Sequence, residues 1–105
     1  MWGLVGSSCE VHYSTAKAGL IGMTKALAKE LGPSGITVNA IAPGVINTDM
    51  NKALSDEDIA VLKDETPLMR IGEGDDVASA ALFLAGDGAS FITGEVLNVS
   101  GGYVI

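Results

Sequence analysis

The chain has 105 residues, which is enough for one small domain, and 48% of them are hydrophobic while only 5% are aromatic. Its net charge of −7 argues against a nucleic-acid partner, because phosphate binding needs clustered Lys and Arg. One cysteine and one histidine exclude an internal disulfide and a metal site built on Cys or several His side chains. Without a signal peptide or a bilayer-spanning apolar run, a cytoplasmic protein that binds no membrane is expected.

Residues 11–31 are predicted to form one long helix. A stripe with helical spacing is formed by Leu20, Thr24, Leu27 and Leu31. Gly19 and Gly22 interrupt this helix, and each costs about 1 kcal/mol relative to alanine. Two such glycines predict that something packs closely against that face. Gly32 and Pro33 should end the helix.

Two strands are predicted. Residues 36–42 are rich in β-branched side chains and lie between Gly35 and a Pro-Gly pair. Residues 95–99 form the second candidate strand, which a glycine pair should end.

A helix is predicted to begin after Ser55, a good N-cap that three acidic residues follow. It should end before Pro67. The acids at residues 56–58 resemble a metal cluster only superficially, since a helix-capping run explains them better.

Residues 72–74 are predicted to be a break, after which another helix opens at Asp75 or Asp76 and runs to about Ala85. The residues expected on its apolar face are Val77, Ala80, Ala81 and Leu84.

The predicted order is helix, strand, helix, helix, strand. Strands separated by helices pair in parallel, which indicates an α/β sheet. Two parallel strands do not complete such a sheet, because it needs several strands and cover on both faces. The sequence therefore predicts an incomplete parallel sheet.

Tyr13 and Lys17 are four residues apart near the start of the long helix, so both lie on one face. An ammonium group beside a phenol stabilises the phenolate, which suits a tyrosine to general acid–base catalysis. Taken alone, this spacing is also typical of an ordinary surface pair.

The context of that pair resembles a known family. Residues 13–19, Tyr-Ser-Thr-Ala-Lys-Ala-Gly, are similar to the Tyr-x-x-x-Lys active-site segment of the short-chain dehydrogenases/reductases. Residues 35–44 resemble that family's penultimate strand and Pro-Gly turn, and residues 46–50 its cofactor-contacting loop. Residues 91–102 resemble its last strand and glycine pair, so the likeness covers nearly the whole chain in order.

This resemblance implies a partial doubly wound α/β Rossmann fold and an NAD(P)-dependent oxidoreductase that reduces a ketone. The 3-oxoacyl-(acyl-carrier-protein) reductases of fatty acid biosynthesis are the most similar group, and the residues just ahead of Tyr13 also resemble the elongation factor P 5-aminopentanone reductases. NADP or NAD would be the cofactor, with NADP favoured, and the full-length form would be a homo-oligomer. The alternatives are a ketone reductase acting on modified elongation factor P, or a truncated, non-catalytic fragment that associates with subunits of the family.

The resemblance also implies roles for single residues. Tyr13 would deliver a proton to the carbonyl oxygen, and Lys17 would hold the nicotinamide ribose and tune Tyr13. Backbone groups around Pro43, Gly44 and Ile46 would hold the nicotinamide, with Ile46 contacting its carboxamide. The full set of implied cofactor-binding residues is Tyr13, Lys17, Pro43, Gly44, Ile46 and Thr48. In a plainer interpretation, Pro43 and Gly44 are only a turn and Thr48 only caps a helix.

Two parts of the family's site are not found in the sequence. The catalytic serine would lie just before Met1, and the glycine-rich loop that holds the pyrophosphate is absent. Residues 1–105 are therefore expected to be the C-terminal part of a single Rossmann domain, with the N-terminal half missing. Met1 is expected to be internal to a longer reading frame or the start of a truncated gene. We expect this chain to be inactive by itself.

Overall fold

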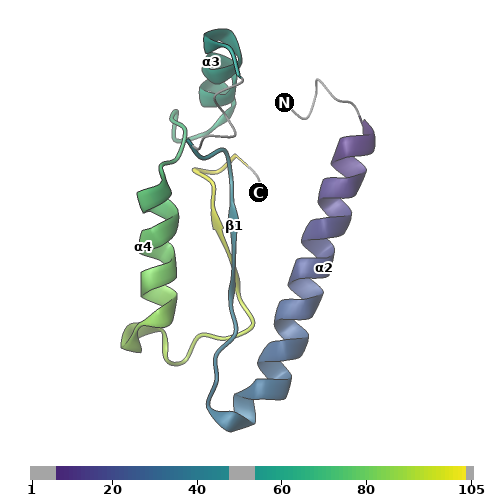
Figure 1. Ribbon diagram of the computed structural model, residues 1–105, viewed down its shortest axis with the longest axis vertical. Helices are drawn as coiled ribbons and strands as arrows, with labels where there is room; N and C mark the ends of the chain where they lie inside the picture. The colour runs from purple at the N-terminus through teal and green to yellow at the C-terminus, as the bar shows by residue number, and fades with distance from the viewer. Residues whose placement is uncertain (1–6, 48–53, 104–105) are drawn as a thin grey trace. The chain divides into compact units, whose positions relative to one another are not determined.

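The computed structural model describes the backbone of residues 7–47 and 54–103, and side chains from Ser14 onward within these ranges. Its elements follow the order helix, strand, helix, helix, strand, as the sequence predicts (Figure 1). They are α2 (Ser7–Leu31), β1 (Ala40–Pro43), α3 (Asp56–Glu65), α4 (Gly74–Ala85) and β2 (Val96–Val99), with short 3₁₀ turns η1 (Gly32–Ser34) and η3 (Asp87–Ala89).

The chain divides into two compact units. The first comprises residues 1–40 and 90–96 and contains α2 with the approaches to both strands. The second comprises residues 41–89 and 97–105 and contains α3, α4 and most of both strands.

Helix α2 begins at Ser7, four residues earlier than predicted. Residues 7–10 contain neither Gly nor Pro, so nothing in them stops the helix from extending backwards. The predicted stripe is confirmed: Thr24 is buried, and the leucines of the stripe are half-buried. The Thr24 hydroxyl donates to the Leu20 carbonyl at 2.6 Å, which satisfies the polar atom that the stripe buries.

The glycine face of α2 differs from the expectation. A Cβ built on Gly19 or Gly22 would have nothing within 4 Å. Within the first unit, as far as the structure describes it, the predicted close packing against this face is not found.

Strand β1 starts later than the predicted 36–42. Before Ala40 one backbone bond remains, from the Gly94 N–H to the Val38 carbonyl at 2.7 Å, and bonds to side chains lie on either side of it. The Val38 N–H donates to the Thr93 hydroxyl at 2.9 Å, and the Glu95 N–H donates to the Asn39 side-chain oxygen at 3.1 Å. Regular pairing then begins where the Ala40 N–H donates to the Glu95 carbonyl at 2.9 Å. β2 accordingly begins one residue after the predicted start.

The two strands are parallel neighbours, as predicted. The Gly44 N–H donates to the Val99 carbonyl at 3.0 Å, with the same sequence offset as the bond from Ala40 to Glu95. A constant offset with both chains advancing is the register of a parallel pair.

Helix α3 is capped as predicted. The Ser55 hydroxyl accepts from the Asp58 N–H at 3.1 Å, and the Asp58 carboxylate accepts from the Ser55 N–H at 3.3 Å. This reciprocal pair is a capping box. The helix ends at Glu65, before Pro67.

Helix α4 begins at Gly74, one residue before the earliest predicted start. Glu73 is its N-cap, and the Asp76 carboxylate accepts from the Glu73 N–H at 2.7 Å. Asp76 is therefore the third residue of the helix, where its side chain caps the first turn, and it is not the residue at which the helix begins.

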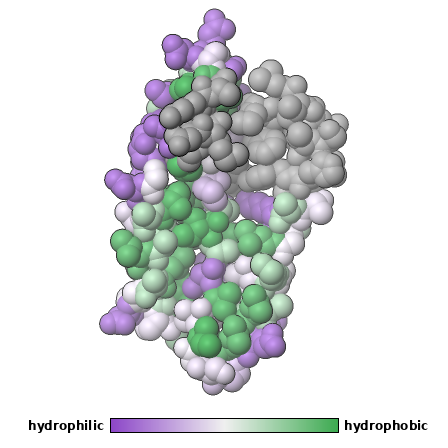
Figure 2. Space-filling view, in the orientation of Figure 1, coloured by the Kyte–Doolittle hydropathy of each residue, from purple (hydrophilic) through white to green (hydrophobic). Residues whose placement is uncertain are grey.

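The apolar face of α4 is only partly covered. Val77, Ala80 and Leu84 are half-buried as predicted, whereas Ala81 is exposed because it lies beside that face. Leu82 and Phe83 are 74% and 53% exposed, and Figure 2 shows apolar residues gathered over this helix. Within the described ranges, no helix combines the length and apolar run that crossing a bilayer requires.

Candidate cofactor and catalytic site

The residues predicted to do the chemistry lie on α2, in the first unit. Helical backbone at Tyr13 and Lys17 confirms that these positions lie one turn apart on the same face. The Lys17 side chain is half-buried, while those of Ser14, Ala16 and Ala18 around it are exposed. The side chain of Tyr13 lies outside the described residues.

The turn that follows β1 carries Pro43, Gly44 and Ile46 in the second unit. A Cβ on Gly44 would lie 2.8 Å from both Cα and Cβ of Ser100, so only glycine fits there. The Gly44 N–H is occupied by the Val99 carbonyl and cannot donate to a ligand. Thr48, the remaining predicted cofactor residue, lies outside the described residues.

A second segment holds this turn. The Asn47 N–H donates to the Gly72 carbonyl at 2.7 Å, and the Gly72 N–H donates to the Val45 carbonyl at 2.9 Å. These bonds form a parallel bridge between Ile46 and Gly72. The sequence predicts only a break at residues 72–74, so this bridge was not anticipated.

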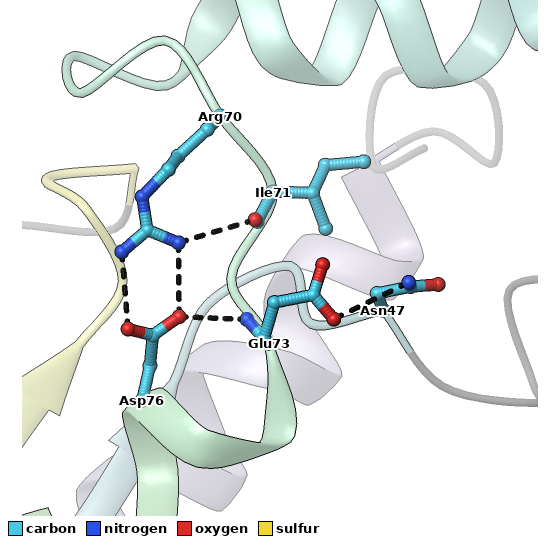
Figure 3. A network of polar contacts seen from close by, with 5 residues as sticks. All are labelled: Asn47, Arg70, Ile71, Glu73 and Asp76. Atoms are coloured by element: carbon cyan, nitrogen blue, oxygen red, sulfur yellow. Dashed lines mark hydrogen bonds and ion pairs between the residues drawn. The ribbon is translucent and has the colours of Figure 1, made fainter. Parts of the chain in front are cut away.

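An ion pair closes the same segment (Figure 3). The Arg70 guanidinium donates two hydrogen bonds to the Asp76 carboxylate, at 2.9 and 3.0 Å. The Asn47 side-chain amide donates to the Glu73 carboxylate at 3.3 Å, which ties the turn to the N-cap of α4. Neither Arg70 nor Asp76 was predicted as a site residue. Asp76, an acidic residue at the third position of α4, is the sequence feature that could have indicated a capping contact here.

The ion pair shifts the pKa of both side chains. Hydrogen bonds from Arg70, and then from the Glu73 backbone, lower the pKa of Asp76 from 3.8 to about 2. The hydrogen bond to Asp76 raises the pKa of Arg70. The Arg70 and Asp76 side chains are 54% and 33% exposed, so the pair adds little to the stability of the fold. Its main effect is to fix the conformation of the segment between the two residues.

A pocket of about 230 Å³ opens beside the turn, within the second unit. It is lined by Val45, Ile46, Arg70, Asp76, Asn98 and Ser100, among others. Of the predicted cofactor residues that the structure describes in the second unit, Ile46 lines this pocket, whereas Pro43 and Gly44 do not. No group of three or more potential metal ligands is found among the residues that the structure describes.

The sequence model of the family described as Enoyl-(Acyl carrier protein) reductase matches residues 2–104. The chain belongs to the short-chain dehydrogenase/reductase family.

Curated relatives within the short-chain dehydrogenases/reductases are similar over most of the chain. The 3-oxoacyl-(acyl-carrier-protein) reductases of Aquifex aeolicus and Escherichia coli are 53% and 49% identical over 100 residues, which is 95% of this chain. That of Chlamydia trachomatis is 54% identical over 104 residues. The chain spans only about two fifths of the length of these relatives.

Solved structures of the family show the same fold. The crystal structure of the 3-oxoacyl-(acyl-carrier-protein) reductase from Brucella melitensis has a TM-score of 0.83 and 44% identity, covering 90% of this chain and 35% of that one. A blue fluorescent protein from a metagenomic library, in complex with NADPH, has a TM-score of 0.79 and 41% identity, covering 89% of this chain and 37% of that one. The predicted partial Rossmann fold is confirmed.

Proposed function

We propose that this chain is the C-terminal part of a short-chain dehydrogenase/reductase that reduces the ketone of a 3-oxoacyl thioester, using NADPH. The observation that carries the proposal is the match of residues 2–104 to the family with its Tyr13 and Lys17 pair in a helix. In this proposal the N-terminal half of the Rossmann domain supplies the glycine-rich loop and the catalytic serine.

Tyr13 is proposed as the general acid. It donates its phenolic proton to the carbonyl oxygen of the substrate as the carbon is reduced, and Lys17 stabilises the phenolate that remains. Lys17 also donates to the nicotinamide ribose. The reduced nicotinamide supplies the hydride when it is bound.

The turn after β1 is proposed to hold the nicotinamide ring. The Gly44 backbone is fixed against β2 by the bond from its N–H to the Val99 carbonyl, and its missing side chain makes room for Ser100. Ile46 is fixed from the other side by Gly72. A turn held at both ends keeps one shape, so Pro43, Gly44 and Ile46 provide a pre-formed surface for the cofactor. Thr48 is proposed to add a hydroxyl contact.

The relatives favour one cofactor and one substrate class among the alternatives. A structural neighbour at 41% identity was solved with NADPH, which favours NADP over NAD. Relatives at 49% to 54% identity are 3-oxoacyl-(acyl-carrier-protein) reductases, which favours a carrier-bound 3-oxoacyl group over modified elongation factor P. A homo-oligomer is proposed for the complete protein.

The direct test joins the upstream part of the Aquifex aeolicus relative to this chain, to give what we call the joined protein. We expect it to reduce a 3-oxoacyl thioester with loss of NADPH absorbance, while the 105-residue chain alone neither reduces the thioester nor binds NADPH. Lys17→Ala should lower kcat and raise the KM for NADPH, because Lys17 has two roles. Lys17→Arg keeps the positive charge and should retain more activity than Lys17→Ala.

Two results would contradict the proposal: a correctly folded joined protein that does not bind NADPH, or a Lys17→Ala variant as active as its parent. An inactive chain that co-elutes with the intact Aquifex relative would instead support a non-catalytic, associating fragment. The exposed apolar side chains on α4 are the observation that favours this second candidate.

A further inference from the structure

The proposed function places backbone groups around Ile46 at the nicotinamide, and the following inference rests on that function. This backbone is bonded to the segment of residues 70–76, which an ion pair closes (Figure 3). We propose that Arg70 and Asp76 are positioning residues of the cofactor site: they fix the two peptide groups that hold the Ile46 backbone, and thereby set the affinity for the nicotinamide cofactor.

The bridge to Gly72 decides which way the Ile46 backbone faces. The Asn47 N–H donates to the Gly72 carbonyl at 2.7 Å, and the Gly72 N–H donates to the Val45 carbonyl at 2.9 Å. In a parallel bridge the bonded groups belong to the residues on either side of the bridged residue, whose own N–H and C=O face the opposite edge. The direction of the Ile46 backbone groups therefore depends on the bridge.

Arg70 fixes the first of the two peptide groups that make the bridge. Besides its two bonds to Asp76, its guanidinium donates to the Ile71 carbonyl at 3.4 Å. That carbonyl and the Gly72 N–H belong to one planar peptide group. Holding the carbonyl therefore sets the direction in which the Gly72 N–H points, which is towards Val45.

Asp76 fixes the second peptide group. Its carboxylate accepts from the Glu73 N–H at 2.7 Å. This N–H shares a planar peptide group with the Gly72 carbonyl, the acceptor for the Asn47 N–H. The two members of the ion pair thus hold the peptide groups before and after Gly72, and each of these groups makes one bond of the bridge.

A direct effect of charge is the rival explanation. NADPH is an anion, and Arg70 and Asp76 both line the pocket that Ile46 lines. If these side chains acted on the cofactor through charge alone, loss of Arg70 would weaken binding and loss of Asp76 would strengthen it. If they act by holding the bridge, loss of either one weakens binding.

The test measures the NADPH dissociation constant by fluorescence titration in the joined protein, together with the KM for NADPH and kcat. A two-bond pair at the surface has a modest effect, so we expect Arg70→Ala and Asp76→Ala each to raise Kd and KM by about 3- to 10-fold. The double variant should bind about as weakly as the weaker single variant, because both belong to one network. The kcat at saturating NADPH should change much less, because the backbone contact binds the cofactor in both ground and transition states.

Two further variants serve as control and as safeguard. Lys63 is an exposed residue of α3 outside the 70–76 segment, so Lys63→Ala removes the same positive charge and should match the parent. Asp76→Asn keeps a side-chain oxygen for the Glu73 N–H but loses the charge. It should weaken binding less than Asp76→Ala, and it decides the sign of the effect if Asp76→Ala does not fold.

Amide hydrogen exchange measured by NMR in the cofactor-free joined protein tests the bridge itself. The amides of Asn47 and Gly72 donate the two bonds, so both should exchange about 3- to 10-fold faster in Arg70→Ala than in the parent.

The inference is overturned if Arg70→Ala binds NADPH as tightly as Lys63→Ala, if loss of the Asp76 charge strengthens binding, or if both amides exchange as in the parent. None of these results touches the proposed function as long as the parent binds NADPH and Lys17→Ala is impaired. A folded parent that does not bind NADPH would overturn both.

Discussion

At the scale of single residues, the ion pair between Arg70 and Asp76 makes a pH-dependent contribution to stability. The folded-state pKa of Asp76 is about 2, below its ordinary value of 3.8. A carboxyl group whose pKa is lowered by folding stabilises the fold fully above the ordinary value, and this contribution is lost as pH falls from 3.8 towards 2.

The predicted outcome is a carboxyl carbon signal of Asp76 that remains in its ionised position between pH 5 and about 3 in NMR spectra of the joined protein. Arg70→Ala should bring the midpoint up towards 3.8, because it removes the largest cause of the shift. A midpoint for Asp76 that is already near 3.8 in the parent would show that the ion pair does not form in solution.

The same scale shows what the sequence can and cannot predict. Tyr13 and Lys17 are recognisable because helix spacing and a local motif place them together. Gly72 and Ile46 are far apart in the sequence, and nothing local indicates that they form a bridge. Their contact is made only in the folded chain.

At the scale of elements, local rules predict helices better than strands. Ser55 and the acids after it locate the start of α3 because capping is a local interaction. The start of β1 depends on Thr93, whose hydroxyl takes over a ladder bond from a distant part of the chain. The capping role of Asp76 was missed because acidic residues at the first and third positions of a helix look alike in sequence.

The open glycine face of α2 leads to a prediction for this element. Gly19→Ala and Gly22→Ala should each stabilise the helix in the 105-residue chain by about 1 kcal/mol, because alanine is the better helix former and each Cβ has open space. Circular dichroism during urea unfolding measures the gain. If a partner packs against this face in the joined protein, the same substitutions should weaken its assembly. Destabilisation in the 105-residue chain itself would mean that another part of the chain covers these glycines.

At the scale of the whole molecule, the described chain leaves much apolar surface uncovered. Its exposed large side chains include Met23, Leu68, Leu82, Phe83 and Phe91. Since a single soluble domain rarely leaves so many large side chains open, this surface fits a chain that covers about two fifths of its relatives' length. In the proposed complete protein, the rest of the Rossmann domain and other subunits would cover this surface.

The central claim, that Tyr13 is the general acid of a short-chain dehydrogenase/reductase, is tested most directly by Tyr13→Phe in the joined protein. Phenylalanine keeps the ring but removes the proton donor, and general acid catalysis is typically worth about 100- to 10,000-fold. We expect kcat for 3-oxoacyl thioester reduction to fall by at least about 100-fold, with the circular dichroism spectrum unchanged. Turnover equal to that of the parent, in a variant with the same dichroism, would contradict it.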